Sequence, residues 1–257
     1  MKRLIAIALA SLSIPSLASA QAAYVSMSFW NVPADPAALI QNPALVAQFQ
    51  SVIDAGADQI HSARLSESEV ANITFYAMND ALDGVLEQTA ALRDGAANNP
   101  GFEMLEVLQG VALTQIDATP ATSRLGYLSG GLGSVSSSDG GCILLSGSSS
   151  AGGCPGAEGQ SEHVSISVWN VPADPAALAQ DPALAGQLQA FVDLGASRLY
   201  PVRLSESSIA ILTFYPVNDA LEGVLAQSRA ARAATAETAP GFELLDVYDA
   251  PVLFVAQ

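Results

Sequence analysis

His61 is the side chain best suited to acid–base chemistry in this sequence. An imidazole has an ordinary pKa near neutrality, so it takes up and releases protons at physiological pH. The chain contains a repeat, described below, in which the residue corresponding to His61 is Tyr200. A histidine present in one copy only belongs either to one half of an asymmetric active site or to a structural position. His61 is therefore a candidate general base, with a structural role as the alternative.

Two arginines begin the repeated string RLSES, at Arg64 and Arg203. A guanidinium at the end of a strand beside a cavity binds carboxylates or enolate-like oxygens through charge-assisted hydrogen bonds. The same group also forms ion pairs on solvent-exposed turns, and Glu67 and Glu206 lie within the two strings. Both arginines are therefore candidates either for ligand binding or for these ion pairs.

The string WNVPADPAAL occurs at 30–39 and again, unchanged, at 169–178. Most of it is explained as a joint between a strand and a helix, in which a proline ends the strand, Asp35 caps the helix and Pro36 begins it. No turn rule requires the Trp-Asn pair at its start. The candidate ligand-binding residues in these pairs are Trp30, Asn31, Trp169 and Asn170.

Several other chemistries lack the residues they need. The sequence has no GxSxG elbow, no glycine-rich phosphate loop and no carboxylate cluster beside a histidine. Lys2 is the only lysine and lies in a segment that we expect to be removed, which excludes Schiff-base chemistry in the mature chain. Cys142 and Cys154 do not stand at ligand spacing from a histidine, so we expect no metal site and no cofactor. We expect these two cysteines to form a disulfide.

The first 20 residues have the composition of a cleavable signal peptide. Lys2 and Arg3 precede the apolar run 4–10, and a small-residue cleavage signature ends at Ala20. The apolar run is too short for a membrane anchor. We therefore expect a periplasmic or secreted protein, in a compartment whose oxidising conditions suit a disulfide.

The charge of the chain excludes two classes of partner. Asp and Glu number 25 against 9 Lys and Arg, which gives a net charge of -16. Such a surface repels phosphate backbones and anionic lipid headgroups, so we expect neither nucleic-acid nor membrane binding.

Two copies of one structural unit must position these candidate residues. Residues 24–90 align without a gap with 163–229. The Gly/Ser-rich segment between the copies is typical of a linker, either a passive tether or one with a short ordered hairpin at its cysteines. The predicted organisation is a signal peptide at 1–20, a first unit at 21–117, a linker at 118–160 and a second unit at 161–257.

Each copy has the pattern of a ferredoxin-like unit, β-α-β-β-α-β. Alternating polar and apolar residues predict a strand at 25–30. Apolar residues at helical spacing predict a helix that ends near Gly56, and Gly195 is the corresponding residue of the second copy. The expected elements that follow are strands at 59–65 and 70–77, a helix from Asn79 or Asp80, and a last strand at 102–108.

One sheet face must be covered by the helices of its own unit, and the other must be covered by the second copy. We assign Met27 and Phe29 to the helix side, which places Ser28 between the two sheets. The same alternation along the third strand of each copy places one tyrosine between the two sheets. We therefore add Tyr76 and Tyr215 to the candidate ligand-binding residues. The space between the sheets is either a ligand site or an ordinary packed interface.

These features resemble the dimeric α+β barrel superfamily, which includes the antibiotic-biosynthesis-monooxygenase-like domains. The resemblance covers both units and rests on the proline-containing turn after the first strand, the aromatic-ended third strands (Thr74-Phe75-Tyr76 and Thr213-Phe214-Tyr215) and the Pro-Gly-Phe before the last strand. It implies two units packed sheet to sheet as an intrachain pseudo-dimer, in a protein that is monomeric. It also implies a small apolar or aromatic ligand in the barrel interior or cleft. Members include cofactor-free oxygenases, isomerases, haem-handling proteins and proteins with no known chemistry.

Three functions are compatible with these residues. The first is an exported protein that binds a small, partly aromatic ligand between its two units. The second is a cofactor-independent monooxygenase or isomerase, and the third is a non-catalytic protein-interaction module. The shortage of titratable groups on the predicted inner face favours binding. An open cleft lined by Trp30 and Trp169 would support the first two functions, whereas a filled interface would support the third.

Overall fold

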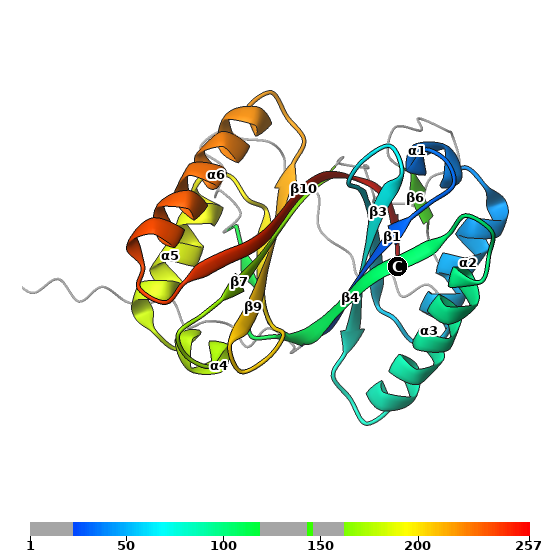
Figure 1. Cartoon of the computed structure of the whole chain (residues 1–257), viewed down its shortest axis with the longest axis horizontal. Coiled ribbons are helices and arrows are strands. Elements are labelled where there is room, and N and C mark those ends of the chain that lie inside the picture. Colours follow the sequence, from blue (N-terminus) through cyan, green and yellow to red (C-terminus); the bar gives the residue numbers. More distant parts are fainter. Residues whose placement is uncertain (1–22, 119–142, 146–161) are drawn as a thin grey trace, which may run out of the picture.

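A computed structural model describes residues 23–118, 143–145 and 162–257. The predicted signal peptide, Cys142, Cys154 and most of the predicted linker lie outside the described residues. Figure 1 shows two lobes, each with strands facing the other lobe and helices on its outer side. None of the helices that the structure describes is long and apolar enough to cross a membrane.

Both copies have the predicted element order. In the first unit the elements are β1 (Ala23–Asn31), α1 (Pro36–Leu39), α2 (Pro43–Asp54), β2 (Gln59–Arg64), β3 (Glu69–Ala77), α3 (Leu82–Ala97) and β4 (Glu103–Ala112). Two short strands follow, β5 (Ile116–Asp117) and β6 (Ile143–Leu145). In the second unit they are β7 (Glu162–Asn170), α4 (Pro175–Leu178), α5 (Pro182–Asp193), β8 (Arg198–Arg203), β9 (Ser208–Pro216), α6 (Leu221–Thr238) and β10 (Glu243–Ala256).

The strands of the two units join into one closed sheet. Within the described residues the order is β2-β3-β1-β4-β8-β9-β7-β10, and β10 pairs again with β2. The first seam joins β4 to β8 through Val111 and Ala112, and the second joins β10 to β2. Because every strand of this ring has a neighbour on both sides, the barrel has no exposed edge. The predicted fold, two tandem ferredoxin-like units packed sheet to sheet, is confirmed.

The predicted assignment of the two faces of the first sheet is wrong. Met27 and Phe29 belong to the core between the sheets, where residues such as Phe214 of the second unit meet them. Ser28 and Trp30 instead face the helices α2 and α3. The alternation of side chains along a strand defines two faces, but both faces of this sheet are covered. Periodicity alone therefore could not show which face the helices cover.

The joint at the start of the first helices has the expected chemistry. The Asp35 carboxylate accepts a hydrogen bond from the Ala37 backbone N–H, and Pro36 is the first helical residue. Asn42 caps α2 in the same way, and Gly56 follows its end with a φ of 114°. The repeat has the same arrangement.

The helix α3 begins later than predicted. Asn79 and Asp80 were the predicted N-caps, but the cap position is Ala81 and has no side-chain hydrogen bond. Asn79 instead accepts from the Ala81 backbone N–H in the turn before the helix. Asparagine forms such local turns as readily as helix caps, so the sequence did not distinguish the two.

Gly110 allows the first seam between the units to form. A Cβ added there would clash with the backbone carbonyl oxygen of Arg203 on the neighbouring strand β8. Only glycine permits this close approach of two backbones.

Candidate functional site

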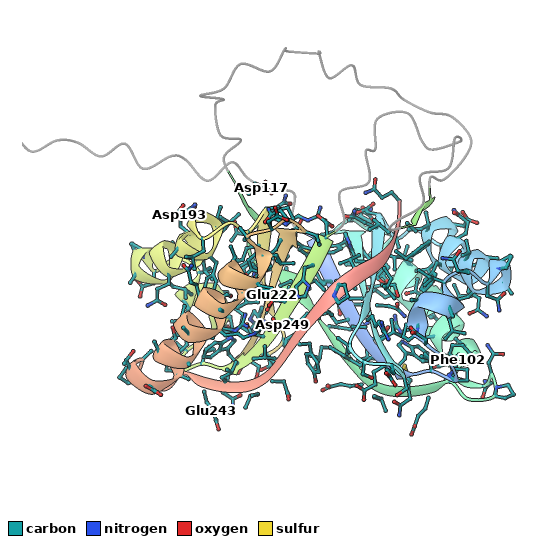
Figure 2. The ribbon with its side chains drawn as sticks, turned by 90° about the horizontal axis from the view of Figure 1, so that it is seen from above. Phe102, Asp117, Asp193, Glu222, Glu243 and Asp249 are labelled. Carbon is teal, nitrogen blue, oxygen red and sulfur yellow. The ribbon has the colours of Figure 1, made fainter. Side chains whose placement is uncertain are left out.

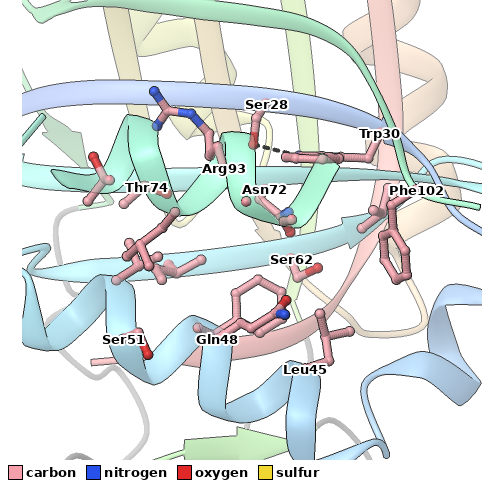
Figure 3. Close-up of a pocket in the computed structure, with 18 of the residues that line it drawn as sticks. Ser28, Trp30, Leu45, Gln48, Ser51, Ser62, Asn72, Thr74, Arg93 and Phe102 are labelled. Carbon is pink, nitrogen blue, oxygen red and sulfur yellow. Dashed lines mark hydrogen bonds between the residues drawn. The ribbon is translucent and has the colours of Figure 1, made fainter. Parts of the chain in front are cut away.

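A cavity of about 320 Å³ lies in the first unit, between its sheet and the helices α2 and α3 (Figure 3). This volume is in the range of small-molecule sites. Most of its wall is apolar and comes from side chains such as Leu45, Phe49, Val52 and Ile60. The polar groups on the wall are fewer and come from β1, β2, β3, α2 and α3: Ser28, Gln48, Ser51, Ser62, Asn72, Thr74, Tyr76, Thr89 and Arg93.

Two predicted ligand-binding residues, Trp30 and Tyr76, line this cavity. Trp30 is 4% exposed and its indole N–H donates to the Ser28 hydroxyl at 2.9 Å. The Tyr76 hydroxyl donates to Thr89 on α3 at 3.3 Å. Their polar ends already have partners, and Tyr76 is only 1% exposed, so Trp30 is the ring with surface left for a ligand.

The helix α2 remains open toward the cavity. All of its residues are described and none is fully buried, whereas the matching helix α5 buries Leu188 and Val192. The predicted apolar face of α2 exists, because Phe49 and Val52 both face inward. It is half-exposed because the space beneath it is not filled by protein.

Asn72 lines this space and carries an unpaired acceptor. Its side-chain oxygen is buried and has no hydrogen-bond partner among the described residues. A buried amide oxygen without a donor costs about 1–3 kcal/mol. A ligand that donates a hydrogen bond to Asn72 would remove that cost.

The second unit has almost no such cavity. The equivalent space measures about 60 Å³. Asn72 is replaced in the repeat by Ile211, Val52 by Phe191 and Ser62 by Pro201. Ile211 and Phe191 pack together in an apolar cluster, which fills the space that is open in the first unit.

Trp169 lines the small cavity of the second unit, and its indole N–H donates to Ser167. Tyr215 is completely enclosed: its ring packs against Leu225 and its hydroxyl lies 3.0 Å from that of Ser228. The two copies therefore keep the same Trp–Ser pair, but only the first offers a cavity of ligand size.

Arg64 and Arg203 lie outside these cavities, at the helix joint. Arg203 forms a bidentate ion pair with Asp174 at 2.8 Å, and Arg64 donates to Asp35 at 3.1 Å. The hydrogen bond from Arg203 holds the pKa of Asp174 below its ordinary value. The predicted ion pairs with Glu67 and Glu206 are wrong, because these arginines turn back toward the helix caps instead.

The two predicted asparagines also point away from the cavities. Asn31 donates to Glu103 on β4, and Asn170 donates to Glu243 on β10, both at 3.2 Å. These contacts join neighbouring strands at the exposed end of each sheet.

His61 lies on the opposite face of the sheet from the cavity. It is fully buried between the units, with its ring against Phe75 and Phe214. Burial, assisted by the positive charge of Arg198, lowers the pKa of His61 to about 3. The imidazole is therefore neutral at physiological pH, and the sheet separates it from any ligand in the cavity.

Arg93 lines the cavity from α3 but was not among the residues predicted from the sequence. Asn72 was not among the predicted site residues either. One signal for Asn72 was available in the sequence. Its counterpart in the repeat is the apolar residue Ile211, and a polar-to-apolar difference between copies indicates a position whose surroundings differ. No such signal marked Arg93, because Arg232 in the repeat is also an arginine.

The described residues provide no metal centre. No group of three or more His, Cys, Asp or Glu side chains among them is arranged to hold a metal ion. The described lining of the larger cavity includes no histidine, cysteine or methionine to ligate haem iron, and the Tyr76 hydroxyl is bonded to Thr89. The residues present therefore do not fit a haem.

Solved structures with the same architecture identify the fold. A "putative monooxygenase" from Fusobacterium nucleatum matches 90% of this chain and 92% of its own, with 8% identity and a TM-score of 0.50. The chain has the dimeric α+β barrel fold. A "putative monooxygenase" from Lactobacillus acidophilus (9% identity, 91% and 94% coverage, TM-score 0.48) and an anthrone oxidase-like protein (12%, 90% and 91%, 0.48) are also similar to this barrel. No protein-family model matches the sequence, and none of the curated proteins is detectably similar to it.

Proposed function

We propose that this protein is exported and binds a small, largely apolar, partly aromatic molecule in the first unit. The observation that carries the proposal is the asymmetry between the copies: one cavity measures about 320 Å³ and its counterpart about 60 Å³. Leaving apolar surface unfilled costs stability, as core cavities do. A ligand that fills the space and pairs with Asn72 offsets this cost. The ligand site lies between the sheet and the helices, and not between the two sheets.

The repeat provides variants for testing this proposal. Val52→Phe and Asn72→Ile give the first unit the residues that fill the second, so we expect them to close the cavity without preventing folding. Native mass spectrometry of wild-type protein purified from its own host should detect a small molecule in a one-to-one ratio, which denaturation releases. The double variant should carry none.

Gln187→Ala is the control, since Gln187 lines only the small cavity of the second unit. This variant should keep the ligand. If the double variant folds and retains the ligand, the site is not in the first unit. If the folded wild type carries no ligand and binds no apolar probe, the proposal is wrong.

A second candidate function is cofactor-independent oxygenation of the bound molecule. Two similar structures are described as putative monooxygenases and a third as anthrone oxidase-like, which supports this candidate. In such a reaction a substrate CH₂ group, acidified by a neighbouring carbonyl, loses one proton to solvent and reacts with O₂. One oxygen atom becomes the new carbonyl and the other leaves as water, so the substrate supplies all four electrons. Arg93 and Asn72 are the cavity groups able to bind the substrate oxygens.

Anthrone is a suitable probe for this reaction. Its conversion to anthraquinone should consume one O₂ per substrate, be faster with wild-type protein than without, and be lost in the Val52→Phe, Asn72→Ile variant. An unchanged rate of O₂ consumption with and without protein argues against oxygenation of this substrate class while leaving the binding proposal intact.

A further inference from the structure

Two arginines at corresponding positions of the repeat have different surroundings. Arg232 on α6 is 4% exposed and donates to the Ser165 hydroxyl at 2.8 Å and to Ser228 at 3.2 Å. It also forms an ion pair with Asp249 at 3.4 Å. Asp249 belongs to β10, and Figure 2 shows it beside α6 in the lobe of the second unit. Arg232 is thus held within the protein by three internal partners.

Arg93 occupies the equivalent position on α3 but has no such partners. It makes no hydrogen bond or ion pair with any other residue that the structure describes, and it lines the larger cavity. Figure 3 shows Trp30 and Phe102 at one end of the view and Arg93 toward the other. The larger cavity therefore has Trp30 and Phe102 at one end, and Arg93 nearer the other.

The replacement of Asp249 by Gln109 contributes to this difference. Gln109 on β4 pairs with Ser26 in the same register in which Asp249 on β10 pairs with Ser165. The Gln109 amide donates to the Ser26 hydroxyl at 3.1 Å. Ser26 corresponds to Ser165, the serine that accepts a hydrogen bond from Arg232, so in the first copy this serine is already paired with Gln109. A neutral amide also supplies no charge to neutralise Arg93. The first copy therefore leaves a guanidinium free for an external anion.

We propose that the ligand of the first unit carries an anionic group, such as a carboxylate, phenolate or enolate, and that Arg93 binds it. This inference rests on the proposed ligand site and specifies its substrate class. The net charge of -16 works against anions at long range, so the attraction must come from the local pairing with Arg93. An apolar body toward Trp30 and an anionic head toward Arg93 together fit the two ends of the cavity.

Two fluorescent probes with the same aromatic skeleton test the charge requirement. Anilinonaphthalene sulfonate is anionic, and N-phenylnaphthylamine lacks the sulfonate. We expect wild-type protein to bind both and to prefer the anion. Arg93→Gln should weaken binding of the anionic probe about tenfold, or about 1.4 kcal/mol, because the anion loses a charge-assisted hydrogen bond. The affinity for the neutral probe should change less than twofold.

Gln109→Asp provides an independent test that leaves Arg93 in place. This variant recreates the carboxylate of the second copy, which should form an ion pair with Arg93 and hold its side chain in the cavity wall. Binding of the anionic probe should therefore weaken as it does in Arg93→Gln. Arg229→Gln is the charge-matched control, since it removes one positive charge from the second unit, where Arg229 pairs with Asp249. It should leave both affinities unchanged.

The possible outcomes separate the two proposals. If neither probe binds wild-type protein, or both bind the Val52→Phe, Asn72→Ile variant as well, the ligand site itself is wrong. If the neutral probe binds in the cavity but the anionic probe does not, or if Arg93→Gln leaves the anion preference unchanged, only the anion inference is overturned. Thermal melting of each variant verifies that it remains folded.

Discussion

His61 is a buried polar residue whose main effect is on stability. Its two ring nitrogens have no hydrogen-bond partner among the described residues, and Nδ1 lies 3.7 Å from a carboxylate oxygen of Glu162. Burial raises the pKa of Glu162 while the charge and hydrogen bond of Arg198 oppose that rise. An imidazole in such a site is tolerated only while it stays neutral.

The stability of the protein should therefore fall in acid through His61. Its pKa is about 3 in the folded protein and 6.5 in an unstructured peptide, so the unfolded chain takes up the proton first as the pH falls. The free energy of unfolding should decrease by about 2 kcal/mol between pH 7 and pH 5 from this residue alone. In His61→Phe, thermal melting should lose this part of the pH dependence. An identical pH profile in wild type and variant would show that His61 is not neutral and buried.

At the scale of the elements, the seam between β4 and β8 depends on one glycine. Gly110→Ala should lower the free energy of unfolding by about 2 kcal/mol or more, because the added methyl group forces the two backbones apart. Chemical denaturation measures the change. Gly84→Ala is the matched control: Gly84 is exposed in α3 with open space around it, so alanine should stabilise the helix by about 1 kcal/mol. Equal effects at the two sites would contradict the close approach at the seam.

The elements themselves were largely predictable from the sequence. Proline after Asp35 and Asn42 marks where α1 and α2 begin, and Gly56 marks the end of α2, because each residue acts through its own backbone. The candidate site was predicted only in part. Trp30 and Tyr76 were identified, but the face to which they point was not, since both faces of the sheet are covered. Arg93 was missed because its availability depends on Gln109, a neighbour distant in sequence.

At the scale of the whole molecule, the units depend on each other. The face of the second sheet that carries Val164, Ile166 and Leu212 is buried only because the first unit covers it. Expressed alone, residues 162–257 should therefore self-associate or aggregate. Light scattering coupled to size-exclusion chromatography should show species larger than one unit, while the full chain should elute as a monomer. A folded, monomeric single unit would contradict this account of the barrel.

The strand β10 sets the order in which the first unit can be completed. Its early part pairs with β7, and Val252–Ala256 pair with β2 of the other unit. During synthesis β2 therefore waits for residues made almost two hundred positions later. Contacts so distant in sequence slow folding, because a long loop must close before they form. The larger cavity, although lined by residues from the first half of the chain, should become fully rigid only when the last strand is in place.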